Sequence, residues 1–178
     1  MKSIALFIAF ACVATIFTAK DCSRKVLHYF DRELEMCLPI LTDTCSEEAK
    51  NRFESMRDCE RRHIAIDRLF CAANSAPVKR SNGESHCYTQ DDPTIVPAGP
   101  CPAGSTCMMG FRVGVCCNST IEAEFSKNQE APCTGSKAAV KRTDNEFNVK
   151  LFGKTCGHHF CPSGSECVQG KYLAYCCE

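Results

Sequence analysis

A net charge is the first thing that this sequence lacks. Its 178 residues include 21 lysines and arginines and 21 aspartates and glutamates, so the formal charge is zero. No stretch forms the basic stripe that attracts nucleic acid, and no polybasic segment would hold the protein on anionic lipid. The sequence therefore predicts neither a nucleic-acid partner nor electrostatic attachment to a membrane.

Long apolar runs are also scarce. One uncharged run lies between Ile4 and Phe17 and is too short for a good membrane span. It follows Lys2 and precedes a small residue near Ala19, an order typical of a secretory signal peptide over residues 1–19. No second long run follows. We therefore expect a secreted, extracellular protein without a membrane span.

The residue patterns of common enzyme sites are missing as well. There is no phosphate-binding glycine loop, and no pair of carboxylates stands out. Ser163 and Ser165 lie in a turn with no indicated base, which a serine nucleophile requires. The segment Cys156–Cys161 includes His158 and His159 and superficially resembles a zinc site, but its cysteines should be disulfide-bonded in an oxidising compartment. We expect no enzyme activity, no metal and no cofactor.

Cysteine, in contrast, is abundant, with 17 residues. Cys12 leaves with the signal peptide, and the sixteen that remain are an even set at a density typical of extracellular disulfide-rich scaffolds. We expect every one of these to be bonded: Cys22, Cys37, Cys45, Cys59, Cys71, Cys87, Cys101, Cys107, Cys116, Cys117, Cys133, Cys156, Cys161, Cys167, Cys176 and Cys177.

One cysteine pattern occurs twice. Cys101–Cys117 and Cys161–Cys177 both fit Cys-Pro-x-Gly-Ser-x-Cys-x-x-Gly-x5-Cys-Cys without a gap. In each copy a short strand, an x-Gly turn and a return strand predict a β-hairpin, with Gly110 or Gly170 supplying a positive φ. Because neighbouring residues on a strand face opposite sides, the two adjacent cysteines at its end should bond to different partners.

The N-terminal part, residues 20–76, predicts a disulfide-stapled helical hairpin. Apolar residues follow helical spacing over Ser23–Leu38. A second helix is expected to begin at a capping box near Thr44 and, after Cys59, to continue or bend into Ile64–Ala73. The register of two such helices predicts two disulfides, Cys37–Cys45 and Cys22–Cys59.

The N-terminal part and the first repeat each contain an odd number of cysteines: five up to Cys71, and five from Cys87 to Cys117. The simplest interpretation is one disulfide between the N-terminal part and the first repeat, with Cys71 as the N-terminal partner. The alternatives are a free thiol in each part or a disulfide to another chain.

Two polar segments separate the parts. Residues 77–86 predict a linker, in which Lys79 and Arg80 form a candidate dibasic processing site. Residues 118–132 predict a second linker, which begins with the sequon Asn118-Ser119-Thr120. We expect a surface glycan on Asn118.

The repeats resemble the lustrin-type cysteine-rich repeat of secreted nematode proteins. Residues 133–178 match the six-cysteine form, and residues 87–117 match it with one cysteine missing. The N-terminal part resembles other helical domains of secreted nematode proteins whose function is unknown. The resemblance implies extracellular modules, found beside protease-inhibitor domains or in matrix proteins, with no catalytic residues.

The sequence therefore predicts a small disulfide-rich fold, in which a stapled helical hairpin precedes two small β-hairpin modules. The role expected is that of a non-catalytic matrix or surface-interaction component with an extracellular protein or the matrix as partner. One alternative is a protease inhibitor that presents Thr89–Pro100 or Thr134–Thr155 as a constrained loop. A second alternative is a secreted ligand processed after Arg80.

Overall fold

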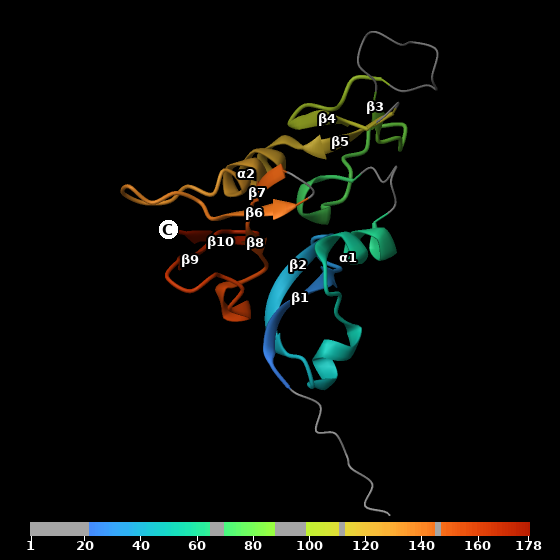
Figure 1. The fold of residues 1–178 in the computed structure, drawn as a ribbon. Coiled ribbons are helices and arrows are strands. Elements are labelled where there is room, and N and C mark those ends of the chain that lie inside the picture. The colour runs from blue at the N-terminus through green and yellow to red at the C-terminus, as the bar shows by residue number, and fades with distance from the viewer. Residues whose placement is uncertain (1–21, 65–69, 88–98, 111–112, 145–146) are drawn as a thin grey trace, which may run out of the picture.

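The computed structural model describes residues 22–64, 70–87, 99–110, 113–144 and 147–178. The predicted signal peptide lies outside these residues, as does most of the loop Thr89–Pro100. The described residues form an N-terminal unit and two repeats, and a helix runs between the repeats (Figure 1). Eight disulfides cross-link these described parts, which agrees with a small disulfide-rich protein.

An antiparallel hairpin opens the N-terminal unit. Strand β1 (Arg24–Asp31) pairs along its whole length with β2 (Met36–Asp43). The helix predicted over Ser23–Leu38 is therefore wrong. Leu27 on β1 and Leu38 on β2 are buried, at 5% and 1% exposure, so the apolar residues that suggested a helical stripe instead anchor two strands.

The turn between the two strands explains why a helix does not form here. The carboxylate of Asp31 accepts hydrogen bonds from the N–H groups of Glu33 (3.1 Å) and Leu34 (2.9 Å). Such local bonds compete with the helical pattern. Glu35 then adopts a φ of 55°, which a regular helix does not contain. Apolar spacing alone fits both structures, and this turn decides between them.

Two short helices stand in place of the long one predicted over Thr44–Ala73. They are the 3-10 helix η1 (Glu47–Asn51) and the α-helix α1 (Met56–His63). The hydroxyls of Ser46 and Ser55 accept hydrogen bonds from backbone N–H groups in their first turns and cap them. Both caps have extended backbone geometry, so each one begins a new helix and a single long helix is excluded.

The disulfides of the N-terminal unit join different cysteines from those predicted. Cys22 bonds to Cys45 and Cys37 bonds to Cys59, with Cα–Cα distances of 5.3 and 6.0 Å. Cys22 and Cys45 lie just beyond the paired ends of β1 and β2, which brings them together. Cys59 is fully buried on α1, which packs against both strands. The pairs Cys37–Cys45 and Cys22–Cys59 required two helices side by side.

Both repeats form three-stranded antiparallel sheets with the same arrangement. The central strand of each sheet carries the adjacent cysteines and lies between two shorter or more exposed strands. The first sheet has the order β3 (His86–Cys87), β5 (Gly114–Asn118), β4 (Ser105–Met109), and the second has the order β8 (Phe152–Gly153), β10 (Ala174–Cys177), β9 (Glu166–Gln169).

The adjacent cysteines bond to different partners in both repeats. Each disulfide of the first repeat has an equivalent in the second. Cys101–Cys116 corresponds to Cys161–Cys176, Cys71–Cys117 corresponds to Cys133–Cys177, and Cys87–Cys107 corresponds to Cys156–Cys167. Cys71 therefore supplies the bond that the odd cysteine counts required. It is the counterpart of Cys133 in the second repeat.

Backbone hydrogen bonds extend this correspondence upstream. The N–H of Val78 donates to the carbonyl of Cys116 at 2.7 Å, and the N–H of Val140 donates to the carbonyl of Cys176 at 2.8 Å. Val78 follows Cys71 at the same sequence spacing as Val140 follows Cys133. The disulfide pattern of the first repeat thus begins at Cys71, so the segment predicted as a linker over 77–86 is part of that repeat's framework.

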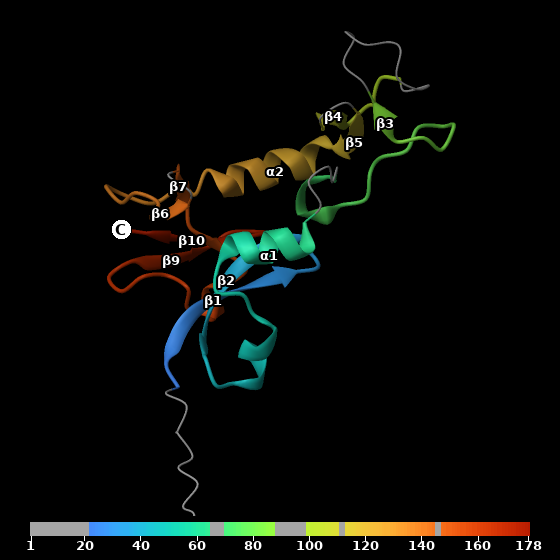
Figure 2. The same cartoon turned by 45° about the vertical axis from the view of Figure 1, so that its right-hand side comes forward.

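The linker predicted over 118–132 is largely a helix. Helix α2 (Ser119–Gln129) follows β5 directly and runs from the first repeat to the second (Figure 2). One apolar cluster joins the N-terminal unit, α2 and the second repeat, and its buried members are Leu34, Leu38, Phe125 and Leu173. The three parts therefore share a core.

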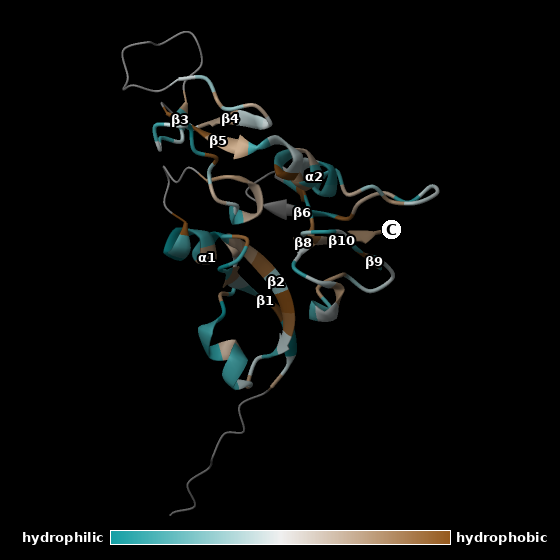
Figure 3. Ribbon diagram, turned by 180° about the vertical axis from the view of Figure 1, so that it is seen from behind, coloured by the Kyte–Doolittle hydropathy of each residue, from teal (hydrophilic) through white to brown (hydrophobic). Residues whose placement is uncertain are grey.

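The apolar residues of the N-terminal unit are concentrated on β2, whereas α1 is mostly hydrophilic (Figure 3). Strand β2 contacts α1, and it also contacts β8 and the 3-10 helix η3 (Cys156–His158) of the second repeat. The remaining elements are the 3-10 helix η2 (Ala72–Asn74) and a hairpin formed by β6 (Lys141–Asp144) and β7 (Phe147–Lys150). Docking against the second repeat thus covers the apolar strand.

Gly170 does not supply the positive φ that was expected of it. In the repeated motif that backbone conformation belongs to Gly104 and Gly164, with φ of 77° and 89°. Position 170 requires a glycine for another reason: a Cβ atom there would lie 2.3 Å from Nδ2 of Asn128 and 2.6 Å from the carbonyl oxygen of Leu173. The turn needs glycine for space.

Candidate functional site

Among the described residues of the N-terminal unit, the start of β1 is the most exposed part of a strand. All residues of Cys22–Val26 are exposed, and Val26 is an exposed large apolar side chain at 36%. Leu27, the next residue, is buried at 5%. Both views in Figures 1 and 2 place this end of β1 away from the two repeats. The segment is therefore open to a partner.

This segment is fixed in an extended shape from the side of β2. The Cys22–Cys45 disulfide ties its first residue to the chain after β2. The N–H of Ser23 donates to Oγ1 of Thr44 at 3.1 Å, and the N–H of Thr44 donates to the carbonyl of Ser23 at 3.0 Å. A covalent bond and two hydrogen bonds thus hold four residues together at the tip.

The rest of β1 is anchored to the helical side of the unit. His28 and Phe53 exchange two backbone hydrogen bonds of 2.8 Å. The ring of Phe30 stacks on that of His63 with centroids 4.7 Å apart and an interplanar angle of 8°. The Cys37–Cys59 disulfide joins β2 to α1. The exposed start of β1 therefore extends from a strand whose other end is rigidly packed.

Two cationic side chains lie on the exposed segment. Lys25 forms an ion pair with Glu54 at the surface. Arg24 makes no ion pair with any residue in the described part of the chain. Neighbouring strand residues face opposite sides, so the small hydroxyl of Ser23 and the guanidinium of Arg24 are offered in different directions.

The opposite end of the hairpin, at the turn between β1 and β2, makes a polar contact with the second repeat. Lys154 lies 3.3 Å from a carboxylate oxygen of Asp31 and 2.9 Å from one of Glu33. Burial would lower the pKa of Lys154, but the hydrogen bonds to Glu33 and Asp31 outweigh it and raise that pKa. Burial, with Asp31 beside it, raises the pKa of Tyr29. These groups serve docking and leave the Cys22 end clear.

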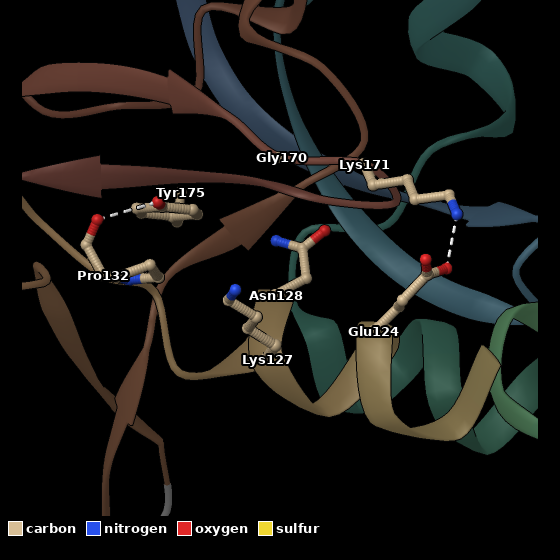
Figure 4. Close-up of a pocket in the computed structure, with 7 residues that line it drawn as sticks. All are labelled: Glu124, Lys127, Asn128, Pro132, Gly170, Lys171 and Tyr175. Atoms are coloured by element: carbon tan, nitrogen blue, oxygen red, sulfur yellow. Dashed lines mark hydrogen bonds and ion pairs between the residues drawn. The ribbon is translucent and has the colours of Figure 1, made fainter. Parts of the chain in front are cut away.

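A second candidate is a cavity of about 230 Å³ between α2 and the turn that joins β9 to β10 (Figure 4). The Asn128 side chain there is bonded to the turn: its Oδ1 accepts from the N–H groups of Tyr172 (2.8 Å) and Leu173 (2.9 Å), and its Nδ2 donates to the carbonyl of Leu173 (3.1 Å). Glu124 pairs with Lys171. These polar groups hold the turn on the helix, so the cavity is not a built ligand site.

The sequon residue Asn118 has a structural role at the start of α2. Its Oδ1 accepts hydrogen bonds from the N–H groups of Thr120 (3.0 Å) and Ile121 (3.1 Å), as a helix N-cap does. Asn118 is half-buried at the end of β5. A glycan on its Nδ2 stays a prediction.

Lys79 and Arg80 lead into a tight turn. The N–H of Arg80 donates to the carbonyl of Glu84 at 2.8 Å, and the N–H of Gly83 donates to the carbonyl of Arg80 at 2.9 Å. Lys79 is exposed and Arg80 is half-buried. Processing here also stays a prediction, and the turn would have to open before a protease could bind it in an extended form.

The segment Cys156–Cys161 does not assemble a zinc site. Its two cysteines are bonded to Cys167 and Cys176, which leaves no thiolate for a metal. His158 lies against Tyr29 instead, with the hydroxyl oxygen 3.4 Å from Nδ1. Elsewhere in the described residues, each close grouping of possible ligands also contains disulfide-bonded cysteines.

No helix in the described residues has the length and apolar character required to cross a membrane.

Two curated proteins are similar to this chain over most of its length. It is 32% identical over 173 residues to a BPTI/Kunitz inhibitor domain-containing protein of Caenorhabditis elegans, an alignment that covers 95% of this chain and 90% of that protein. It is 31% identical over 158 residues to the major allergen Ani s 1 of Anisakis simplex, which covers 86% of this chain and 76% of the allergen. No family model and no solved structure matches.

The chain therefore belongs to the class of disulfide-rich proteins with a BPTI/Kunitz inhibitor domain. The assignment to lustrin-type repeats is wrong, because the relative that matches over 95% of this chain is a BPTI/Kunitz inhibitor domain-containing protein. Sequence reasoning missed the N-terminal hairpin and its exposed edge. The run Val26–Phe30 contained the signal, since β-branched and aromatic residues favour strands.

Proposed function

We propose that this protein is a secreted, non-catalytic protease inhibitor, and that the segment Cys22–Val26 is its protease-binding edge. The family membership supports the inhibitor role over that of a matrix component. The observation that carries the choice of segment is its geometry: an exposed, extended strand end is tied down by the Cys22–Cys45 disulfide. The partner is an extracellular protease.

The binding mode follows from the shape of the segment. An extended chain can add as a strand to a protein edge, so that backbone hydrogen bonds supply affinity and alternate side chains enter pockets. Before His28, β1 has pairing only to β2 within the described residues, so its outer edge offers backbone groups to a partner. Because the disulfide and the bonds to Thr44 already fix this shape, little conformational entropy is lost on binding.

The side chains of the segment define which proteases to test. A protease with an acidic specificity pocket would accept the guanidinium of Arg24, whereas one with a small pocket would accept the side chain of Ser23. Trypsin-like and elastase-like proteases are therefore the two classes for titration. Lys25 is held by Glu54 and is a weaker candidate for a deep pocket.

The loops suggested by sequence are less suitable. Thr89–Pro100 lies mostly outside the described residues. In Thr134–Thr155, Arg142 is half-buried and its Nη1 lies 3.3 Å from Nε2 of His28, so this cation is engaged inside the molecule. A cut after Arg80 is also a poor route to a released ligand, because the Cys71–Cys117 disulfide joins the two sides.

The test is a titration of the intact, disulfide-bonded protein against one protease of each class. We expect Arg24→Asp or Ser23→Asp to weaken inhibition at least about tenfold, which corresponds to about 1.4 kcal/mol of binding free energy. Lys141→Asp introduces the same charge on an exposed residue of the β6–β7 hairpin and should leave inhibition unchanged. Equal inhibition by all three variants would show that another surface binds the protease.

A further inference from the structure

Three sulfur atoms meet on one face of the sheet in the first repeat. In the strand register, Gly114 on β5 lies between Cys87 on β3 and Met109 on β4. Gly114 has no side chain, so sulfur atoms fill the space above it. A Cβ atom at this glycine would lie 2.7 Å from Sδ of Met109, 2.7 Å from Sγ of Cys107 and 2.8 Å from Sγ of Cys87. The Met109 thioether thus lies against the Cys87–Cys107 disulfide, with Sδ 3.5 Å from Sγ of Cys107.

The second repeat fills the equivalent space with carbon. Ala174 stands where the first repeat has Gly114, on the central strand of the sheet. The ring of Phe160, which is buried at 3%, packs in one cluster with Ala174. The first repeat has the exposed Pro100 at the motif position of Phe160. An inert, buried ring therefore covers this face of the second sheet, whereas a thioether covers the disulfide of the first.

The thioether of Met109 is open to oxidants. Met109 is 42% exposed, whereas Met36 is half-buried and packs against the apolar cluster that the three parts share. When a thioether reacts with a hydroperoxide, the sulfur takes up one oxygen atom and loses two electrons, the O–O bond breaks, and an alcohol or water leaves. The sulfoxide is polar, so it does not pack on other sulfur atoms as the soft, apolar thioether does.

We propose that Met109 is an oxidation site that controls how fast the Cys87–Cys107 disulfide is reduced. Cys87 is buried at 1% and Cys107 is half-buried, so an external thiol reaches the disulfide through Cys107, the sulfur that Met109 covers. Oxidation by a hydroperoxide moves the Met109 side chain off this sulfur. An external thiolate then attacks Sγ of Cys107, the S–S bond breaks, and Cys87 leaves as a thiolate. A second thiolate resolves the mixed disulfide, so the external thiols become the oxidised pair.

The structural effect of this reduction is local. Strand β3 is two residues long, and the Cys87–Cys107 disulfide ties it to β4 across the sheet. Reduction therefore releases β3, while Cys101–Cys116 and Cys71–Cys117 still hold β5. The three sulfur atoms lie in the first repeat and the segment Cys22–Val26 lies in the N-terminal unit, so the oxidation site is independent of which surface binds a protease.

The oxidation step is tested on the full-length, unreduced protein with dilute hydrogen peroxide. Met109 should gain an oxygen atom about tenfold faster than Met36, because burial protects a thioether. Trypsin cuts after Arg80 and Arg112 and at no position between them, so the peptide that contains Met109 also contains Cys107. Fragmentation of this peptide in the mass spectrometer locates the added oxygen. Equal oxidation of the two methionines would contradict the proposed accessibility of Met109.

The second step is tested by brief exposure to a dilute thiol, followed by an alkylating reagent that labels each released cysteine. Peroxide treatment should make the labelling of Cys107 about tenfold faster. Labelling of Cys167, the equivalent half-buried cysteine of the second repeat, should stay the same. If oxidised and unoxidised protein are labelled at Cys107 at the same rate, Met109 does not control the disulfide and the proposal is overturned.

Met109→Leu is the decisive variant, because leucine keeps an apolar side chain that peroxide does not oxidise. In this variant, peroxide should no longer change the labelling of Cys107, and an effect that persists would overturn the proposal. Met108→Leu is the matched control. Met108 is also exposed, at 36%, but it points to the opposite face of β4, so this variant should respond to peroxide as the unmodified protein does.

If Met109→Leu fails to fold, partial oxidation of the unmodified protein decides, since one peptide reports both reactions. A label on Cys107 that is concentrated in the peptides with oxidised Met109 supports the control of the disulfide by this thioether. A label that is spread equally over peptides with and without the added oxygen refutes it.

Discussion

Space, and not backbone freedom, makes residue 170 a glycine. The side-chain amide of Asn128 reaches across from α2 to the backbone of Leu173, and Gly170 lies directly against that amide. The side-chain amide of Asn128 therefore both donates to and accepts from the backbone of the turn, as the backbone of a neighbouring strand would. A methyl group at Gly170 would push this amide away.

The first prediction concerns that close approach. Gly170→Ala should lower the free energy of unfolding by about 1–3 kcal/mol, the usual cost of overpacking, because the added Cβ would meet backbone as well as the amide. Gly157→Ala is the control, since its nearest atoms belong to Thr155 at 3.8 and 4.0 Å. Urea unfolding of the disulfide-intact proteins measures both. Equal stability of the two variants would contradict the close-packing explanation.

At the scale of an element, α2 depends on the residue that begins it. Asn118 ends β5 and caps α2, so one side chain supports the change from strand to helix. The same residue is the predicted glycan acceptor. The two roles use different atoms of the amide, because the cap uses Oδ1.

Two variants separate these roles. Asn118→Ala removes both the cap and the sequon, whereas Thr120→Ala removes the sequon alone and leaves the N–H of residue 120 to be capped. In protein made without glycosylation, Asn118→Ala should be less stable than Thr120→Ala by about 1 kcal/mol. Chemical unfolding gives this difference, and no difference would mean that the cap is unimportant. A secreting eukaryotic host would add the glycan, so the unmodified protein made there should be heavier than its sequence mass. Loss of this added mass in both variants would establish the glycan.

Elements differed in how far the sequence could predict them. The strands around Cys107 and Cys167 were predictable because a repeated motif with turn residues fixes a hairpin locally. The N-terminal hairpin was not, since the apolar spacing of Val26, Leu27 and Phe30 fits a helix equally well. Its turn depends on the carboxylate of Asp31 and on Glu35 with positive φ, which composition does not reveal.

At the scale of the whole molecule, one disulfide joins the N-terminal unit to the first repeat. Cys71, at the end of the N-terminal unit, is bonded to Cys117 on β5, the strand that leads into α2. The predicted processing site at Arg80 lies between these cysteines in the sequence. A cut there would give two chains joined by sulfur.

This topology makes a direct prediction. A protein with a specific protease sequence in the turn at Asn82 should, after cutting, keep one band on a denaturing gel without reductant and give two fragments with reductant. Changing both Cys71 and Cys117 to alanine should release the fragments without reductant. Two fragments from the cut parent protein before reduction would contradict the Cys71–Cys117 pairing.

The candidate site could be predicted only in part. A disulfide-constrained segment as the binding surface was a reasonable expectation, yet the loops proposed were those with prolines or with Lys141 and Arg142. The exposed edge at Ser23 and Arg24 depends on Cys22 meeting Cys45, a long-range contact that follows from strand pairing. Two helices in the N-terminal part would not bring Cys22 to Cys45, so a helical prediction excludes that contact.

The position of Cys22–Val26 at the end of the hairpin opposite the docking turn has an evolutionary consequence. Substitutions at Ser23 or Arg24 touch neither the shared apolar cluster nor the contacts of Lys154. In the proposed inhibitor, selection can therefore change which protease is bound, one surface side chain at a time, while the rest of the molecule keeps its architecture. Diversification at this tip carries no folding penalty for the repeats.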